Sequence, residues 1–123
     1  MLSDVDHLNT LIGSAFNIRN YIGPLTVKEF RDLHHGMQRD AVVWRFQVVV
    51  AAARRVSAPL KAAHPEIPWR RLTEDYGEWI SDDRSVDFTH LWQTGTQELP
   101  NLIPRIVAML RSFVPPDEPD ERQ

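Results

Sequence analysis

Apolar side chains recur at spacings of three and four residues over most of the chain, a pattern typical of helices that bury one face. In the first such stretch, from about residue 4 to 21, the apolar stripe includes Val5, Leu8, Ile12 and Phe16. No stretch of the sequence alternates apolar and polar residues in the way that a half-buried strand requires. The sequence therefore predicts an all-α protein with four to five helices.

Capping and breaking residues predict where the first helices begin and end. Ser3 and Thr26 each stand three positions before an acidic residue, which is the arrangement of a capping box at a helix start. Gly23-Pro24 is expected to end the first helix, and Gly36 to end a short second one. Ser57 is placed to cap a further short turn.

The middle and the second half of the chain predict further helices. A third helix, from about 39 to 56, has the features of a central core helix, and a fourth is expected from about 68 to 80. Asp87 is placed to cap the last helical region. Because proline lacks a backbone N–H, we expect this region to be interrupted at Pro100 and Pro104.

Composition narrows the class of protein. With 123 residues, 42% hydrophobic and 25% charged, the chain suits one soluble domain, expected over 1–114 and followed by an acidic, proline-rich, disordered tail over 115–123. No apolar run approaches the roughly 20 residues that cross a bilayer, and Met1 to Asp6 lacks an export signal. We therefore expect a cytoplasmic protein with no membrane contact. The absence of cysteine excludes disulfides and a cysteine nucleophile.

Several short motifs resemble a known family. The most specific is His64–Arg70, with the sequence HPEIPWR. A second set comprises Val86–Phe88, Leu91–Trp92 and Glu98–Pro100, and a third motif, Asp40–Val42, opens the third helix. Together these motifs resemble the HepT-like branch of the HEPN ribonuclease toxins. The resemblance implies an antiparallel helical bundle that dimerises through the helices carrying the active site.

The resemblance also implies where a ribonuclease site would lie. Many members cleave RNA without a metal, using an Arg, a His five residues later and a Tyr two residues beyond it. A gap-free register between Trp69 and Trp92 puts Tyr76 at the position of the Arg, Ser81 at that of the His and Asp83 at that of the Tyr. In active relatives that Tyr accepts AMP from a nucleotidyltransferase antitoxin. None of the three family residues is retained.

The replacements remove the groups that the reaction needs. Metal-free RNA cleavage requires a proton-transfer group active near neutral pH and a cation that stabilises the developing charge. A hydroxyl at Ser81 has no useful basicity, and an ordinary phenol at Tyr76 carries no charge. Between Thr73 and Arg84, five acidic residues face that single Arg, a net charge of −4 that should repel RNA.

The leading hypothesis is thus a catalytically degenerate HepT-like protein without catalytic residues, metal or cofactor, linked to a toxin–antitoxin system and acting by protein binding. It would act as a homodimer, or pair with a nucleotidyltransferase antitoxin or an intact HEPN relative. One alternative is an active ribonuclease toxin using other residues, with His34 and His35 as candidates. Another is a stand-alone helical interaction module.

Other residues allow two interpretations each. Trp44, Trp79 and Trp92 are predicted to be core or dimer-interface anchors rather than a stacking platform for bases. The pairs Arg54-Arg55 and Arg70-Arg71 suit an RNA-binding patch or salt bridges to acidic neighbours. His90 is expected to be a packing or surface residue. The acids Asp75, Glu78 and Asp82 suit Mg²⁺, but a solvated acidic face is commoner.

Overall fold

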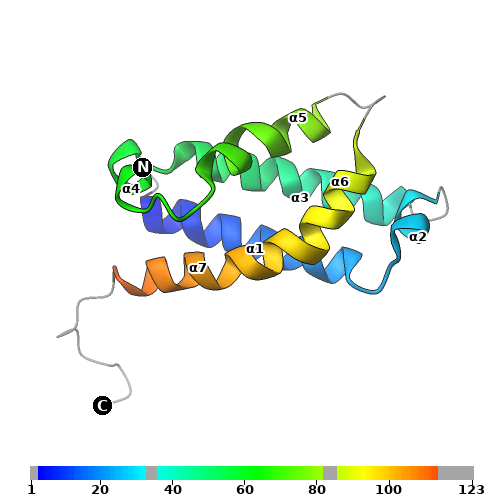
Figure 1. Ribbon diagram of the computed structural model, residues 1–123, viewed down its shortest axis with the longest axis horizontal. Coiled ribbons are helices and arrows are strands. Elements are labelled where there is room, and N and C mark those ends of the chain that lie inside the picture. Colours follow the sequence, from blue (N-terminus) through cyan, green and yellow to red (C-terminus); the bar gives the residue numbers. More distant parts are fainter. Residues whose placement is uncertain (1–2, 33–35, 82–85, 114–123) are drawn as a thin grey trace, which may run out of the picture.

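The computed structural model is a bundle of long helices that run side by side (Figure 1). It describes residues 3–32, 36–81 and 86–113, and within these ranges it contains helices and no strand, so the predicted all-α fold is confirmed. Its helices are α1 (Asp4–Ile22), α2 (Val27–Arg31), α3 (Gly36–Arg55), α4 (Ala58–Ala63), α5 (Tyr76–Ile80), α6 (Phe88–Gln93) and α7 (Leu99–Arg111), with two π-helical turns, η2 (Arg71–Asp75) and η3 (Thr94–Glu98).

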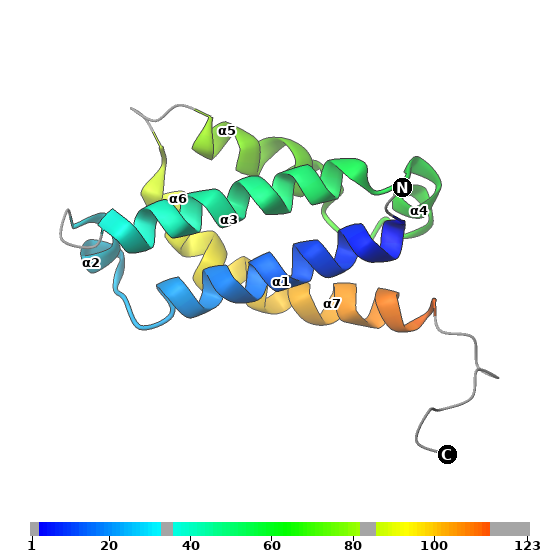
Figure 2. The ribbon, with the colours of Figure 1, turned by 180° about the vertical axis from the view of Figure 1, so that it is seen from behind.

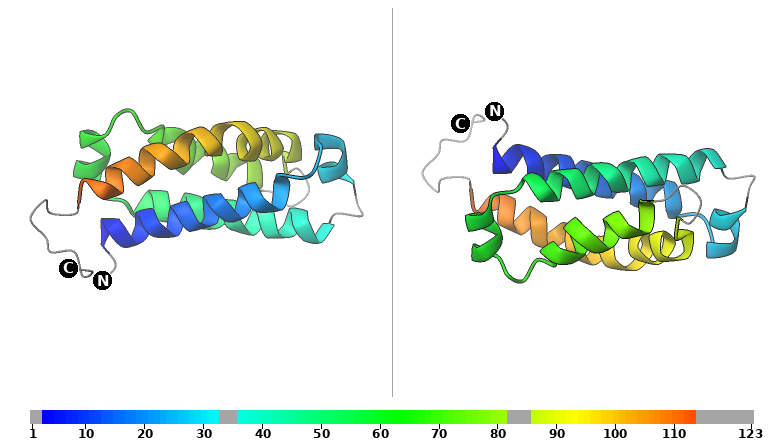
Figure 3. Two further views of the ribbon diagram at one scale, coloured as in Figure 1. Left: turned by 90° about the horizontal axis from the view of Figure 1, so that it is seen from below. Right: turned by 90° about the horizontal axis from the view of Figure 1, so that it is seen from above.

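Neighbouring long helices are antiparallel. From behind, α1 lies between α3 and α7, and its N-terminal end is beside the C-terminal ends of both (Figure 2). The η2–α5 segment covers the other side of α3, as the two perpendicular views also show (Figure 3). The inward faces of all these helices form one core. Its fully buried side chains include Leu8, Leu11, Ile18, Phe30, Phe46, Val49, Leu72, Leu91, Leu99 and Ile106.

The four predicted helix caps are confirmed. Ser3 and Thr26 both form complete capping boxes, and the side chains of Ser57 and Asp87 accept backbone hydrogen bonds at the starts of α4 and α6. The prediction that Gly36 ends the second helix is wrong, because α2 already ends in extended backbone at residue 32 and Gly36 is the first residue of α3. Glycine weakens a helix chiefly in its interior, so a terminal position tolerates it.

A long-range clamp holds the start of α1. The carboxylate of Asp4 accepts hydrogen bonds from the backbone N–H of Ser57 at 2.8 Å and from its hydroxyl at 2.7 Å. These bonds, with the Ser57 hydroxyl contributing most, lower the pKa of the Asp4 carboxyl. The clamp fixes α1 to the corner where α3 gives way to α4.

Two π-helical turns widen the helices of the second half. In η2 the N–H of Tyr76 donates to the carbonyl of Arg71, and in η3 the N–H of Leu99 donates to the carbonyl of Thr94. The interruptions expected at Pro100 and Pro104 do not occur, since helix runs without a gap from 88 to 111. Pro100 lies in the first turn of α7, next to the wide turn, where its missing N–H does least harm.

Some expectations concern parts of the chain that the structure does not describe. The tail over 115–123, His34, His35 and Asp83 lie outside the described residues. The domain boundary at 114 therefore stays a prediction. Within residues 3–32, 36–81 and 86–113, no helix has the length and apolar character that would let it span a membrane.

Candidate functional site

A polar cluster joins the two π-helical turns. Arg71 opens η2 and Glu98 closes η3, so the two turns bring residues 27 positions apart into contact. The Nε of Arg71 donates to both carboxylate oxygens of Glu98, at 2.9 and 2.8 Å, and its Nη2 donates to the same group. The hydroxyl of Tyr76 donates to Glu98 at 2.9 Å, and Nη1 of Arg71 donates to Asp75 at 3.4 Å.

The charges in this cluster stabilise one another. Hydrogen bonds from Arg71 lower the pKa of the Glu98 carboxyl, and the carboxylate in turn raises the pKa of the Arg71 guanidinium. Burial, followed by the nearby Glu98 charge, raises the pKa of the Tyr76 phenol. Tyr76 is therefore a neutral donor and Glu98 an anion at neutral pH. The cluster has the properties of an internal structural link.

Aromatic rings extend the cluster towards the surface. The indole of Trp79 has the Arg71 guanidinium 5.1 Å from its ring centroid and packs 5.4 Å from the ring of Tyr76. His90 stacks on Trp79 at 4.7 Å, with the planes 9° apart, and its Nδ1 pairs with the carboxylate of Asp87. A His paired with an Asp near a guanidinium has the groups that proton transfer needs. From the sequence, His90 was expected only to be a packing or surface residue. The spacing of three between Asp87 and His90 at a helix start was the available signal.

The two described positions that the register aligned with the family's site lie in different surroundings. Tyr76, aligned with the Arg, is only 1% exposed and packs edge-on against Phe46 at 5.5 Å. Ser81, aligned with the His, is exposed at the end of α5, and its hydroxyl donates to the carbonyl of Glu78 at 3.1 Å. The structure thus places one side chain in the core and the other at the surface.

The negative charge of the segment from Thr73 to Arg84 is partly neutralised by two arginines just before it. Arg70 pairs with Glu74 at 3.0 Å, and Arg71 pairs with Asp75 at 3.4 Å. For Arg70-Arg71 the structure thus shows the salt bridges that one of the two interpretations predicted, and they offset part of the negative charge counted from the sequence. Among the described residues, no group of three or more His, Asp or Glu is placed to hold a metal ion.

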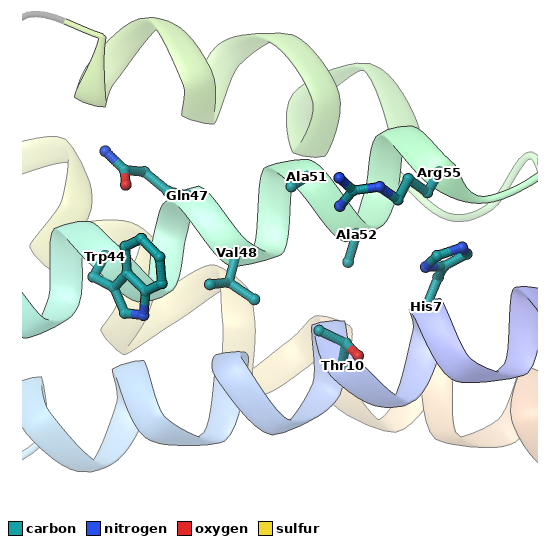
Figure 4. A pocket seen from close by; sticks show the side chains of 8 residues that line it. All are labelled: His7, Thr10, Trp44, Gln47, Val48, Ala51, Ala52 and Arg55. Atoms are coloured by element: carbon teal, nitrogen blue, oxygen red, sulfur yellow. The ribbon is translucent and has the colours of Figure 1, made fainter. Parts of the chain in front are cut away.

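The tryptophans divide into engaged and exposed side chains. The indole N–H of Trp92 donates to the carbonyl of Leu25 at 2.8 Å and ties α6 to the loop after α1, while Trp79 belongs to the polar cluster. Trp44, on α3, is 60% exposed. It stands at one end of a groove of about 380 Å³ between α1 and α3, lined by His7, Thr10, Trp44, Gln47, Val48, Ala51, Ala52 and Arg55 (Figure 4).

Comparison with known proteins points to the family that the motifs resemble. Over 62 residues the chain is 31% identical to a protein of Thermococcus cleftensis named probable ribonuclease HepT. The match covers 50% of this chain and 56% of that relative's length, so the chain spans about half of it. No family model matches the sequence, and no solved structure matches it significantly. The similarity to this relative supports a relationship between the chain and HepT.

Proposed function

We propose that this protein is a HepT-like protein of the HEPN superfamily that does not cleave RNA and acts by binding other proteins. The observation that carries the proposal is the burial of Tyr76, a residue that is 1% exposed and whose hydroxyl donates to Glu98. At the corresponding position the family has an Arg that stabilises the developing charge. A buried neutral phenol cannot reach or stabilise a phosphate.

The position of the family's histidine supports the same proposal. Ser81 lines a surface hollow together with Arg54, Glu74, Gly77 and Glu78, and none of these described residues is a histidine. The Nε of Arg54 donates to the carbonyl of Thr73 at 3.0 Å, which ties this guanidinium to the backbone of η2. Losing one preorganised stabilising donor costs about 10²–10³ in rate, so the loss of base and cation together leaves activity near background.

One observation favours the alternative of an active ribonuclease that uses other residues. His90 is paired with Asp87 and is 49% exposed, which leaves its imidazole open to solvent as a potential general base. Arg71 lies over the same indole that His90 stacks on. The Arg71 guanidinium, however, is bound to Glu98 and is not free for a phosphate.

An RNA cleavage assay separates the two functions. The purified chain, in excess over labelled single-stranded RNA and with EDTA present, should give no cleavage above buffer. His90→Ala and Asp87→Asn should behave like the wild type, and Asp87→Asn keeps a good helix cap. Cleavage by the wild type that disappears in both variants would establish the alternative, whereas a contaminating nuclease would cleave equally in all three preparations.

A binding assay tests the partner. In active relatives the accepting Tyr receives AMP from a nucleotidyltransferase, and here Asp83 stands at that position. We expect a nucleotidyltransferase encoded beside this gene to bind the chain without transferring AMP to it. Co-purification tests the binding, and mass spectrometry after incubation with ATP tests the transfer. An AMP adduct on the chain would contradict the proposal.

A further inference from the structure

The groove between α1 and α3 has an apolar middle and polar ends. Side chains of α3, among them Val48 and Ala51, line its middle, and the exposed ring of Trp44 stands at one end (Figure 4). His7 and Arg55 line the other end. The volume of about 380 Å³ falls within the roughly 300–1,000 Å³ of sites that bury a ligand. The groove is thus large enough to hold a short stretch of extended chain.

The two basic side chains at this end can take an acidic partner. Neither His7 nor Arg55 takes part in a salt bridge or side-chain hydrogen bond within residues 3–32, 36–81 and 86–113. The carboxylates of Asp4 and Asp6, which lie near His7, each accept hydrogen bonds from a serine instead. This end of the groove therefore suits a further acid.

The segment that follows α7 starts at the same end of the bundle. The C-terminal end of α7 lies beside the N-terminal end of α1, and α1 lies between α7 and α3 (Figure 2). To reach the groove the chain has to cross α1, which as a helix is roughly 10 Å across. Extended chain rises about 3.1 Å per residue, so residues 114–117 span about 12 Å. From residue 117 onward the chain can therefore enter the groove.

The sequence of this segment contains a short repeat. Residues 116–122 read PDEPDER, which is proline, Asp and Glu repeated twice and followed by an Arg. A polyproline II helix has three residues per turn, so it would place Pro116, Pro119 and Arg122 on one face and the acids on the other two. One face of the segment would then suit an apolar floor, while its acids could meet basic side chains at the rim.

The length and the charges of the segment match the groove. Extended chain from Asp117 to Arg122 spans about 16 Å, and α3 from Trp44 to Arg55 spans about 17 Å. An acid would meet the cation at one end, and Arg122 would meet an aromatic ring at the other. Proline-rich segments bind aromatic-lined grooves because their extended conformation is already formed. Reach, charge order and the proline repeat identify the occupant as the C-terminal segment of this chain.

We propose that residues 114–123 cross α1 and cover the groove between α1 and α3. Asp117 meets Arg55 at the near end. Arg122 lies over Trp44 at the far end, and Pro119 packs on the apolar side chains between them. The contact goes beyond the function proposed above, because it controls access: a partner that binds the outward face of α3 has to displace the segment.

The covered and open states have comparable populations. Ion pairs at the surface contribute little, and ordering the segment costs conformational entropy. The contact therefore adds little to the stability of the bundle. It leaves the groove open to a competitor in a substantial part of the molecules.

A disulfide tests the contact in the full-length chain, which has no cysteine of its own. Thr10→Cys lines the α1 side of the groove, and Asp120→Cys stands next to Pro119. On mild oxidation of a dilute sample these two thiols should form an intramolecular disulfide. In the matched control Ala62→Cys, exposed on α4 at the same end of the bundle, replaces Thr10→Cys and should react at least about tenfold more slowly. Equal rates, or a disulfide only between two chains, would overturn the proposal.

Charge exchange tests which side chains meet. In the chain with the Thr10→Cys/Asp120→Cys pair, Arg55→Glu should slow disulfide formation about two- to fivefold, because an acid then faces Asp117. Adding Asp117→Arg should restore the rate. Lys28→Glu, the same change of charge on exposed α2 at the other end of the bundle, should leave it unchanged. An unchanged rate in Arg55→Glu, or equal slowing by Lys28→Glu, would exclude the pairing.

The indole N–H resonance of Trp44 tests the far end of the groove in a chain without cysteine. In the wild type this resonance should shift between low and high salt, because salt screens the ion pairs and releases the segment. Arg122→Ala should move it towards its high-salt position already at low salt. The indole resonances of Trp79 and Trp92, which are engaged within the bundle, should stay in place. A Trp44 resonance that responds neither to salt nor to Arg122→Ala would defeat the proposal.

Discussion

Two regions of this protein use the same kinds of side chain in opposite ways. The polar cluster at the π-helical turns and the outward face of α3, with Asp40, Trp44 and Arg55, each combine an Arg, an acid and a large aromatic ring. In the cluster Arg71 binds Glu98, which also accepts from Tyr76. On the outward face of α3 all three of these side chains are exposed. The cluster is therefore expected to stabilise the fold, and the outward face of α3 to contribute little to its stability.

The largest effect on stability should come from removing the buried ring of the polar cluster. Tyr76→Ala should lower the free energy of unfolding by about 3–5 kcal/mol, because a buried ring is replaced by a cavity and Glu98 loses a donor. Tyr76→Phe keeps the ring and should cost about 1 kcal/mol. Urea denaturation followed by circular dichroism measures both. A loss below 1 kcal/mol for Tyr76→Ala would show that the cluster is not structural.

Removing the shared acceptor should have a smaller effect. Glu98→Ala leaves the Arg71 guanidinium and the Tyr76 hydroxyl without their partner, which should cost about 2 kcal/mol. This value lies below that of a fully buried ion pair because the two charged side chains are 39% and 36% exposed and solvent screens them. Glu78→Ala, the loss of an exposed acid on α5, is the control and should change the stability by less than about 0.5 kcal/mol.

The dependence of stability on pH should show that Glu98 is ionised in the folded protein. Its pKa in the folded protein is lowered from the ordinary value of 4.5, chiefly by the hydrogen bonds from Arg71. The ionised group thus contributes stability above pH 4.5, and this contribution is lost as the pH falls through the lower folded-state pKa. Asp4 and Asp87 also have lowered pKa values, so they too make the wild type less stable as the pH falls. Glu98→Gln should therefore flatten the fall in stability below pH 4.5 without abolishing it, and an unchanged slope would contradict the assignment.

The smallest effect on folding should come from the outward face of α3. Trp44→Ala should change the free energy of unfolding of the monomer by less than about 0.5 kcal/mol, because the ring is mostly exposed. The measurement must be made at a concentration at which the wild type sediments as a monomer, since dimerisation adds apparent stability. A loss above 2 kcal/mol would place Trp44 with the structural residues and remove the contrast.

The sequence predicts features that depend on neighbouring residues and misses those that depend on distant ones. The caps at Ser3, Thr26 and Asp87 were predicted because a cap needs only the next three residues. The π-helical turns were not predicted, since no residue type marks them, and without them the contact between Arg71 and Glu98 has no local signal. The register located Tyr76 but could not show that its side chain points into the core.

The clamp between Asp4 and Ser57 has a consequence for how the native state opens. The end of a helix normally frays, and its amide protons then exchange with solvent through small local openings that need no wider unfolding. Here the carboxylate of Asp4 holds the first turn of α1 against the corner after α3, 53 residues away. The amides of Asp6 and His7, which donate to the hydroxyl and the carbonyl of Ser3, should therefore resist deuterium labelling until α1 and α3 separate. Asp4→Ala should release them while leaving the middle of α1 protected.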